Sequence, residues 1–398
     1  MQILMGLLGI VVILGFLYIF SSNRKMIRWK TILIALAVQF ALAVFIVKIP
    51  LGREIMTILS NGVTAVVDCS ANGLSFVFGD LADSNKVACF FVQSLGNVVF
   101  VFALVEFLYY IGVLGFVVKV IGKGLGKLLG TSAVESFVAV ANTFLSMTNA
   151  PVLVSKYLST LTDSEIMVVL VSGMGSVNVA VLGGYAALGI PMEYLLVSCV
   201  MVPVGSILVS KMLFPQIDPV TKIDDIKVEN DTSYQNALDA IVSGASSGMS
   251  MIVSIAASLI AVLGMVALVD LILGFAHTDL ETIFSYILAP FGFLMGFNAQ
   301  DALREGALLG QKLALNEFIA FGTLGESIQS LDPRFVMMSS ISLAGFANLS
   351  SMGICVAGIG SLCPEKKGVL ARLVFRGMIG GLIVSILSAI LCGIAYLL

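Results

Sequence analysis

The sequence predicts an all-α polytopic membrane protein with about eight transmembrane helices and two re-entrant hairpins. Its 398 residues are 59% hydrophobic and only 11% charged, whereas soluble domains contain about 25% charged residues. Apolar runs of about 20 residues, long enough to span a bilayer, recur along the chain. Two pairs of these runs are interrupted by polar residues at corresponding places in the two halves, a pattern typical of transporters built from inverted repeats.

Residues 1–134 are expected to form scaffold helices and helices that lie at the membrane surface. The predicted spans are Ile3–Phe20, Thr31–Val47 and Ala88–Tyr110. Basic residues follow the first span rather than precede it, which is the reverse of a signal peptide, so we expect a retained helix whose N-terminus lies outside. Gly52–Phe78 and Gly112–Gly130 mix polar and apolar residues at helical spacing and are predicted to lie along the membrane surface.

Residues 135–214 are expected to form a first transport repeat. Glu135–Thr160 crowds polar side chains and Pro151 into its centre. A helix that faces lipid would not tolerate them, whereas two half-helices that meet at Ser146–Pro151 inside the protein would. Ser164–Leu188 contains the polar, glycine-rich stretch GMGSVNVAVLGG and predicts a broken helix, and Met192–Phe214 predicts an ordinary span.

Residues 215–280 are expected to connect the repeats through a polar cytoplasmic loop and a scaffold helix. The loop, Gln216–Tyr234, is the most polar segment of the chain. Asn236–Ser250 is an amphipathic lead-in to a predicted span at Met251–Phe275.

Residues 281–398 predict a second transport repeat with the same order of elements. Pro290 is expected to interrupt the apolar run Leu280–Met295. A hairpin, a broken helix with FANLSSMG at its centre and a closing span are then predicted at Gly296–Glu326, Phe335–Gly360 and Val369–Leu398.

The distribution of lysine and arginine supports this topology. With both termini outside, 15 of these residues fall on the cytoplasmic side and six outside, which accounts for all 21. The bias agrees with the excess of positive charge in cytoplasmic loops. The six expected outside are Lys48, Arg53, Lys86, Arg304, Lys312 and Arg334.

The polar side chains at predicted membrane depth indicate the chemistry of a ligand. They are Asn142, Ser146, Thr148, Asn149, Ser176, Asn178, Asn316, Glu317, Asn348, Ser350 and Ser351. These amides, hydroxyls and single carboxylate suit a neutral ligand rich in hydroxyls, because a carboxylate accepts two hydrogen bonds from a diol. No arginine or lysine is among them, which disfavours an anionic substrate.

A structural explanation remains open for several of these residues. An unpaired carboxylate in lipid costs ~2.5–3.5 kcal/mol on insertion scales, so Glu317 either faces a ligand or reaches the membrane surface from a helix end. Asn348, Ser350 and Ser351 could instead join helices through hydrogen bonds worth ~0.6 kcal/mol each.

Other function classes find little support in the composition. The chain has no basic block that would bind nucleic acid, and its six cysteines lack metal-ligand spacing. The single histidine, His277, lies in a predicted loop. One carboxylate without a histidine or lysine neighbour does not make a catalytic site. We therefore expect neither an enzyme nor a bound cofactor.

Three motifs give the chain a resemblance to a known family. They are VESFVAVAN (Val134–Asn142), KLALNEF (Lys312–Phe318) and GFANLSSMGI (Gly345–Ile354). In these motifs, and over nearly its whole length, the chain resembles the concentrative nucleoside transporters. The resemblance implies a homotrimer in the plasma or inner membrane, in which each protomer has a scaffold domain and a mobile transport domain.

The resemblance also implies roles for particular residues. Glu317, Asn348 and Ser351 would bind ribose, and Phe346 would line the same pocket. Met147, Thr148, Asn149 and Val181 complete the implied substrate-binding set. Asn142, the Ser176 hydroxyl and the carbonyls of Leu145 and Val177 would bind sodium. Proton-coupled members often lack the asparagine, so its presence favours sodium.

One departure from the family pattern affects the expected substrate. The family usually reads Gly-Gln-Thr/Ser-Glu at the tip of the first hairpin, where this chain has Ser146-Met147-Thr148-Asn149. Met147 offers only apolar contact and a weak acceptor to a nucleobase. The expectation is therefore import of nucleosides by sodium symport, with broad or weak base selectivity. Proton symport, a related ribosylated compound and a channel or substrate sensor remain alternatives.

Overall fold

The computed structural model describes residues 1–83, 85–219 and 234–398, and within these ranges it contains helices and no strands. Eight helical stretches are long and apolar enough to cross a membrane, in agreement with the predicted number but not with every predicted span. The stretch Pro50–Ala82 is one of the eight, whereas the predicted span Phe335–Gly360 is not, because it consists of two shorter helices. Most of the predicted loop Gln216–Tyr234 lies outside the described residues.

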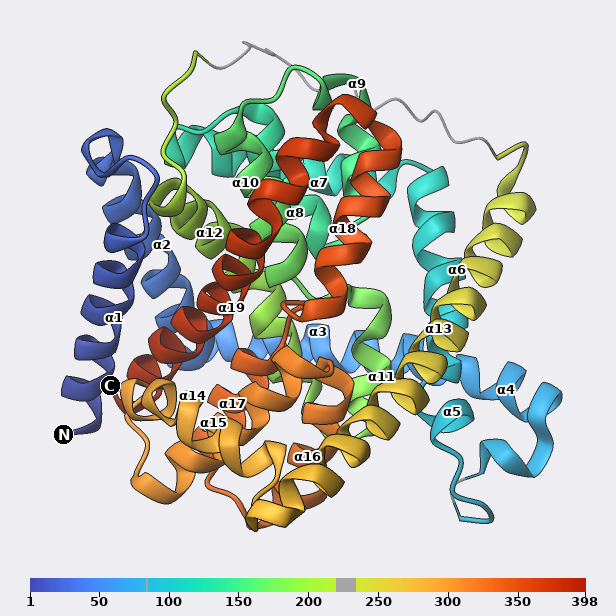
Figure 1. Cartoon of the computed structure of the whole chain (residues 1–398). Coiled ribbons are helices and arrows are strands. Elements are labelled where there is room, and N and C mark those ends of the chain that lie inside the picture. The colour runs from blue at the N-terminus through green and yellow to red at the C-terminus, as the bar shows by residue number, and fades with distance from the viewer. Residues whose placement is uncertain (84, 220–233) are drawn as a thin grey trace.

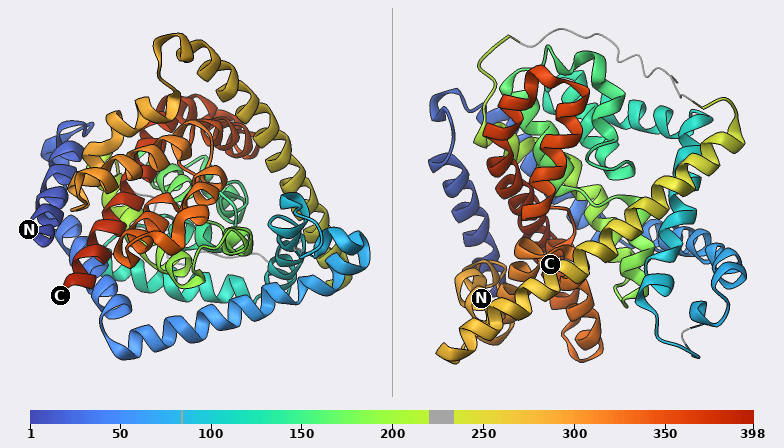
Figure 2. Two further views of the ribbon diagram at one scale, coloured as in Figure 1. Left: turned by 90° about the horizontal axis from the view of Figure 1, so that it is seen from below. Right: turned by 45° about the vertical axis from the view of Figure 1, so that its right-hand side comes forward.

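The N-terminal helices surround one side of the molecule. They are α1 (Gln2–Ile19), α2 (Trp29–Val47), α3 (Pro50–Asp68), α4 (Ser70–Phe78), α5 (Phe90–Gln93), α6 (Gly96–Tyr110) and α7 (Val113–Leu129). Figures 1 and 2 show α3 lying crosswise to α1 and α2, as expected of a helix at the membrane surface. The predicted third span is present as Phe90–Tyr110, in which a short turn separates α5 from α6.

A single helix, α13 (Ala237–Leu273), replaces the predicted lead-in and span. Its 37 residues correspond to about 55 Å at 1.5 Å per residue. A hydrocarbon core is about 30 Å thick, so a helix of this length must tilt or extend beyond it. Figure 2 shows α13 crossing the molecule obliquely, with α6 packed against one end.

The first repeat contains the predicted hairpin, broken helix and span. Its elements are α8 (Ala133–Phe144), η3 (Ala150–Val154), α9 (Ser155–Leu158), α10 (Asp163–Gly175), η4 (Val179–Val181), α11 (Leu182–Ala187) and α12 (Met192–Leu213). One arm of the hairpin differs from the prediction. After the tip the chain forms a 3-10 turn and one α-helical turn instead of a half-helix, and Pro151, which cannot donate a backbone hydrogen bond, lies at the start of that turn.

The second repeat has the same order of elements. They are α15 (Ala299–Ala314), α16 (Glu317–Ser327), α17 (Pro333–Leu343), α18 (Leu349–Leu362) and α19 (Lys367–Leu397), preceded by α14 (Leu280–Leu294). α14 bends into α15 by 118°. The predicted interruption at Pro290 is wrong, because α14 continues through this residue. Membrane proteins tolerate such prolines where neighbouring groups satisfy the freed carbonyl.

Side-chain caps explain where the helices of the repeats begin. Ser132 with Glu135, and Thr162 with Glu165, form capping boxes at the starts of α8 and α10. In the second repeat the side chains of Asn316 and Asn348 cap α16 and α18. Helices α10, α17 and α19 form the buried centre of the fold.

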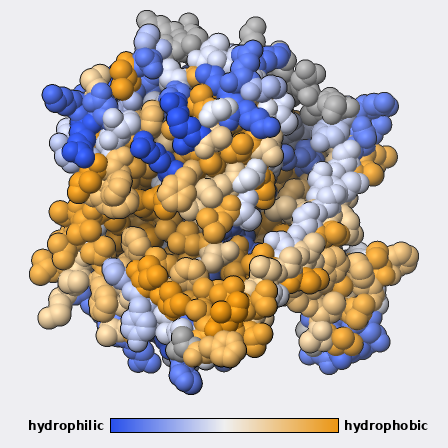
Figure 3. All heavy atoms as spheres, in the orientation of Figure 1, coloured by the Kyte–Doolittle hydropathy of each residue, from blue (hydrophilic) through white to orange (hydrophobic). Residues whose placement is uncertain are grey.

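The surface agrees with a membrane protein. Figure 3 shows hydrophobic residues over the middle of one face and hydrophilic residues gathered at the top and bottom. The connection between α1 and α2, helix α7 and the turn η7 (Pro364–Lys366), which carry predicted cytoplasmic charges, all lie at the upper end in Figure 1. The two termini lie near each other, towards the other end.

Candidate functional site

The unwound breaks of the two repeats meet at the centre of the molecule. The Phe346 amide donates a hydrogen bond to the Ser176 carbonyl at 3.2 Å, which joins the break after α17 to the break after α10. Gly345 makes this approach possible, since its φ is +108° and a Cβ there would lie 2.5 Å from the Gly175 carbonyl oxygen. A side chain would be strained by the angle and excluded by the contact.

The tips of both hairpins and both breaks line one cavity of about 400 Å³. Its volume lies within the range of about 300–1,000 Å³ that is usual for sites of small molecules. Seven of the eight predicted substrate-binding residues line it: Met147, Thr148, Asn149, Glu317, Phe346, Asn348 and Ser351. The eighth, Val181, is fully buried beside the first break and is not among the lining residues.

Glu317 is the single acidic residue that lines this cavity in the described part of the chain. Only 4% of its surface is exposed, so the alternative that it reaches the membrane surface is wrong. The Tyr185 hydroxyl donates to Oε1 at 3.0 Å, and Asn348 Nδ2 donates to Oε2 at 3.3 Å. Each carboxylate oxygen can accept a further hydrogen bond, and the N-terminal end of α16 favours the negative charge.

Asn348 connects helix α18 to this carboxylate. Its Oδ1 accepts hydrogen bonds from the Ser351 amide at 2.9 Å and the Ser350 hydroxyl at 2.7 Å, while its Nδ2 donates to Glu317. The amide side chain is therefore fixed by local contacts. The alternative that Asn348 only joins helices is incomplete, because it also lines the cavity.

The tip of the first hairpin offers fewer polar groups to the cavity than its sequence suggests. The Ser146 and Thr148 hydroxyls lie 3.1 Å apart and share a hydrogen bond, and the backbone N–H of Asn149 donates to Ser146 Oγ at 3.2 Å. The Cys355 thiol lies 3.5 Å from the Met147 sulfur. The side of the cavity expected to face a base is thus partly apolar.

The residues predicted to bind a cation surround the first break. Asn142 is fully buried, and its Nδ2 donates to Ser172 Oγ at 2.8 Å, while its Oδ1 has no hydrogen-bond partner. Leu145 and Val177, whose carbonyls complete the implied set, lie on the non-helical segments after α8 and α10. The Ser176 hydroxyl donates to the Gly173 carbonyl at 3.2 Å. A buried, unpaired amide oxygen with nearby hydroxyl and carbonyl oxygens suits a hard monovalent cation.

Sequence reasoning missed two buried charges in the second hairpin. Lys312, which we counted among the charges on the outer side, is fully buried, and Glu305 is fully buried as well. Lys312 interacts electrostatically with both Glu305 and Glu317, so the expectation that the carboxylate has no lysine neighbour is wrong. The available signal was the spacing of seven residues between Glu305 and Lys312, which places both on one face of α15.

Two further groups near the cavity were not anticipated. Tyr185, fully buried, packs its ring against Phe318 and Phe321 with centroids 4.5 and 4.6 Å away. In the sequence, Tyr185 is a polar aromatic residue beside a predicted break, and this position could have indicated a role near the cavity. Helix α13 contributes hydroxyls at helical spacing along the cavity: Ser247, Ser250, Ser254 and Ser258.

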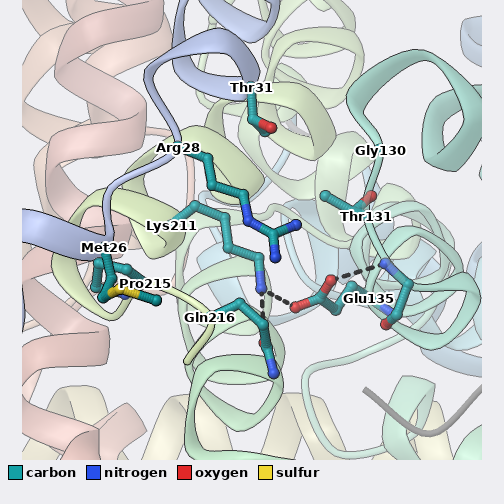
Figure 4. A pocket seen from close by; sticks show the side chains of 10 residues that line it. Met26, Arg28, Thr31, Gly130, Thr131, Glu135, Lys211, Pro215 and Gln216 are labelled. Atoms are coloured by element: carbon teal, nitrogen blue, oxygen red, sulfur yellow. Dashed lines mark hydrogen bonds and ion pairs between the residues drawn. The ribbon is translucent and has the colours of Figure 1, made fainter. Parts of the chain in front are cut away.

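A smaller pocket near the start of α8 does not fit a substrate. Figure 4 shows Lys211 from α12 pointing at Glu135, with which it forms a buried ion pair. Lys211 also donates to Ser164 Oγ at 2.9 Å. The pocket holds only about 40 Å³, far below the usual volume of a ligand site. This cluster fixes the ends of α8, α10 and α12 to one another.

Comparison with known proteins places this geometry in a family. Three family models match in succession: "Na+ dependent nucleoside transporter N-terminus" at residues 8–81, "Nucleoside recognition" at 91–192 and "Na+ dependent nucleoside transporter C-terminus" at 194–393. The nucleoside permease NupC of Helicobacter pylori is 34% identical over 409 residues, covering 98% of this chain and 97% of the relative. The uncharacterized transporter YutK of Bacillus subtilis is also 34% identical and covers 99% of both chains.

Solved structures give the same result. CNTnw in an inward-facing, substrate-bound state superposes with a TM-score of 0.96 at 31% identity, covering all of both chains. A CNTnw variant in an outward-facing state gives the same TM-score and identity. Human solute carrier family 28 member 3 is 30% identical over 97% of this chain, which spans 59% of that longer relative. The chain therefore belongs to the concentrative nucleoside transporter family.

Proposed function

We propose that the chain imports nucleosides across the cell membrane by sodium symport, with alternating access to the central cavity. The observation that carries the proposal is Glu317, buried in a cavity of about 400 Å³ with hydrogen-bonding capacity left on both oxygens. A cis diol presents two hydroxyl donors that match the two oxygens of one carboxylate. Asn348 and Ser351, on the facing end of α18, supply further polar contacts to the sugar.

The base of the nucleoside occupies the part of the cavity between Phe346 and the tip of the first hairpin. Phe346 provides an aromatic face, and Met147 provides an apolar, adaptable one. Thr148 and Asn149 retain limited polar capacity there, and buried Val181 packs behind the first break. A mostly apolar surface discriminates by size and shape, typically by about 1–3 kcal/mol. The expected substrates are therefore nucleosides of more than one base.

Sodium binds at the first break in this proposal. The unpaired Asn142 Oδ1 and the Ser176 hydroxyl are side-chain ligands, and Leu145 and Val177 contribute carbonyls. The ligand set has no carboxylate that could carry a proton, which favours a metal cation over a proton as the coupling ion. Bound sodium would hold the tip of the first hairpin against α10 and so shape the cavity for substrate.

The transport domain comprises residues 135–214 and 281–398, which move together against the scaffold of residues 1–134 and 215–280. The hydrogen bond from Phe346 to Ser176 and the packing of Gly345 on Gly175 support joint movement of the two breaks. The serines of α13 would give the sugar successive hydroxyl partners as the cavity passes along the scaffold. The family resemblance further supports a homotrimer, and the distribution of lysine and arginine supports both termini outside.

Uptake of radiolabelled uridine and adenosine into proteoliposomes tests the proposal. A sodium gradient should drive accumulation of both, and a proton gradient alone should not. Accumulation driven equally by protons would reassign the coupling ion, and equilibration without accumulation under either gradient would indicate a channel. Ribose 5-phosphate, which carries the sugar with an anionic group, should compete poorly, because no arginine or lysine of the described residues lines the cavity.

A further inference from the structure

The two repeats place different groups at equivalent positions of their hairpins. The C-cap residue of α8 is Leu145, and that of α15 is Leu315. Counted back from these ends, Glu135 and Glu305 each lie ten residues earlier, and Asn142 and Lys312 each lie three residues earlier. Asn142, whose oxygen is proposed to bind the cation, thus corresponds to a lysine in the second repeat.

Lys312 directs its positive charge at the break of its own repeat. Its Nζ donates to the carbonyl of Ser342 at 2.8 Å and to that of Ala344 at 3.2 Å. Ala344 caps α17 in extended conformation, as Ser176 caps α10 in the first repeat. The ammonium group therefore lies against carbonyls that end a broken helix, which is the chemical environment that such breaks offer to cations.

The buried glutamates of the two hairpins also have different partners. In the first repeat Lys211 from α12 pairs with Glu135, at the end of α8 remote from the break, and the Asn142 oxygen remains unpaired. In the second repeat the Ser339 and Ser342 hydroxyls each donate to Glu305 at 2.5 Å. Lys312, fully buried, lies in the field of both Glu305 and Glu317. Positive charge is built into the second break and is not built into the first.

We propose that Lys312 is a tethered cation that fills, in the second repeat, the position equivalent to the cation site of the first. Replacing it by an uncharged residue leaves two helix-end carbonyls without their donor, in the field of two buried carboxylates, which makes a new site for a small monovalent cation. The wild-type transport domain then binds one mobile cation at this pair of breaks, and the Lys312→Met variant binds two. The inference rests on the proposed function for the identity of the first site.

Thermal unfolding of the purified protein, in sodium chloride against choline chloride at equal ionic strength, measures the binding directly. A ligand that binds only the folded state raises the melting temperature. Lys312→Met should melt lower than wild type in choline and show a larger sodium-dependent rise. The Hill coefficient for the sodium dependence of uptake should be about one in wild type and should rise towards about two in Lys312→Met, in line with the number of cation sites.

Two variants separate this role from a purely structural one. Lys211→Met removes the buried lysine that pairs with Glu135, the counterpart of Glu305 in the first repeat. It should lower the melting temperature without making that temperature depend more on sodium. Asn142→Ala should lose the sodium-dependent rise, and the double variant Asn142→Ala with Lys312→Met should regain one. A folded double variant that is insensitive to sodium overturns the inference.

Failure of the proposed function gives a different result. If sodium is not the coupling ion, wild type and Asn142→Ala respond equally to sodium, while Lys312→Met still gains a response.

If Lys312→Met does not fold, Lys312→Gln is measured in the same way. Reversal-potential measurements on wild type then give the number of cations moved with each nucleoside. One cation is expected, and two would overturn the inference.

Discussion

Replacement of Glu317 by glutamine tests the centre of the proposed site with little change of shape. The substitution keeps the side-chain volume and removes the negative charge. Hydrogen bonds to a charged group contribute about 1.5–3 kcal/mol each, compared with about 0.5–1.5 for neutral ones. Two bonds from a ribose diol would each weaken by about 1–1.5 kcal/mol, which lowers transport at unsaturating substrate by about 30-fold to 150-fold.

The structure supplies a matched control for this variant. Tyr185→Phe removes the hydrogen bond to Glu317 Oε1 but leaves the charge and the stacking on Phe318 in place. It should weaken substrate binding less than Glu317→Gln does, because the substrate still meets a charged carboxylate and the lost hydrogen bond is not one that the substrate makes.

Initial rates of uridine uptake at substrate concentrations well below half-saturation are the assay for both variants. The amount of folded protein is measured by monodisperse elution in detergent, so that loss of activity is not confused with loss of protein. Uptake by Glu317→Gln equal to that of wild type would refute the ribose-binding role. An equal loss in Tyr185→Phe and Glu317→Gln would show that geometry rather than charge is limiting.

Three further substitutions address the ion, the base and the crossing of the breaks. Asn142→Ala should raise the sodium concentration for half-maximal uptake at least tenfold, because it removes an oxygen ligand from a small cation; an unchanged sodium dependence would contradict the assignment. Met147→Gln with Asn149→Glu should narrow base selectivity, measured by competition among nucleosides, because it adds polar groups that can read a base edge; unchanged competition would place base recognition elsewhere. Gly345→Ala should abolish uptake and lower the melting temperature by several degrees, because its Cβ would lie 2.5 Å from the Gly175 oxygen; wild-type uptake would show that the breaks separate readily.

Much of the fold followed from the sequence because membrane insertion constrains apolar length strongly. The broken helices at Ser164–Leu188 and Phe335–Gly360 were predictable, since polar residues at membrane depth require protein or ligand partners. The continuous α13 was not, because its first half is rich in small and polar residues and resembles a surface segment. Pro290 misled for a related reason: a proline predicts a break in water but is accommodated in a membrane helix.

The candidate site was predictable where polar residues interrupt apolar ones, and not where charge is compensated within the fold. Glu317 and Asn348 stand out in apolar surroundings, and the structure brings them to one cavity. Lys312 was assigned outside, because a counting rule for loops cannot recognise a lysine whose partners come from another helix 30 residues later. Its acceptors are backbone carbonyls, which carry no signature in the sequence.

The hairpin tips show how one architecture serves two kinds of recognition. Both tips present to the cavity the two residues that follow the C-cap of the preceding helix: Ser146 and Met147 in the first repeat, Asn316 and Glu317 in the second. In the second tip a capping asparagine and the start of α16 stabilise a carboxylate. The first tip lacks a regular helix at this place, and the Ser146 and Thr148 hydroxyls bond to each other. In the proposed function, charge-assisted recognition of the substrate therefore comes from Glu317 on the sugar side, because the first tip presents no charged side chain to the cavity.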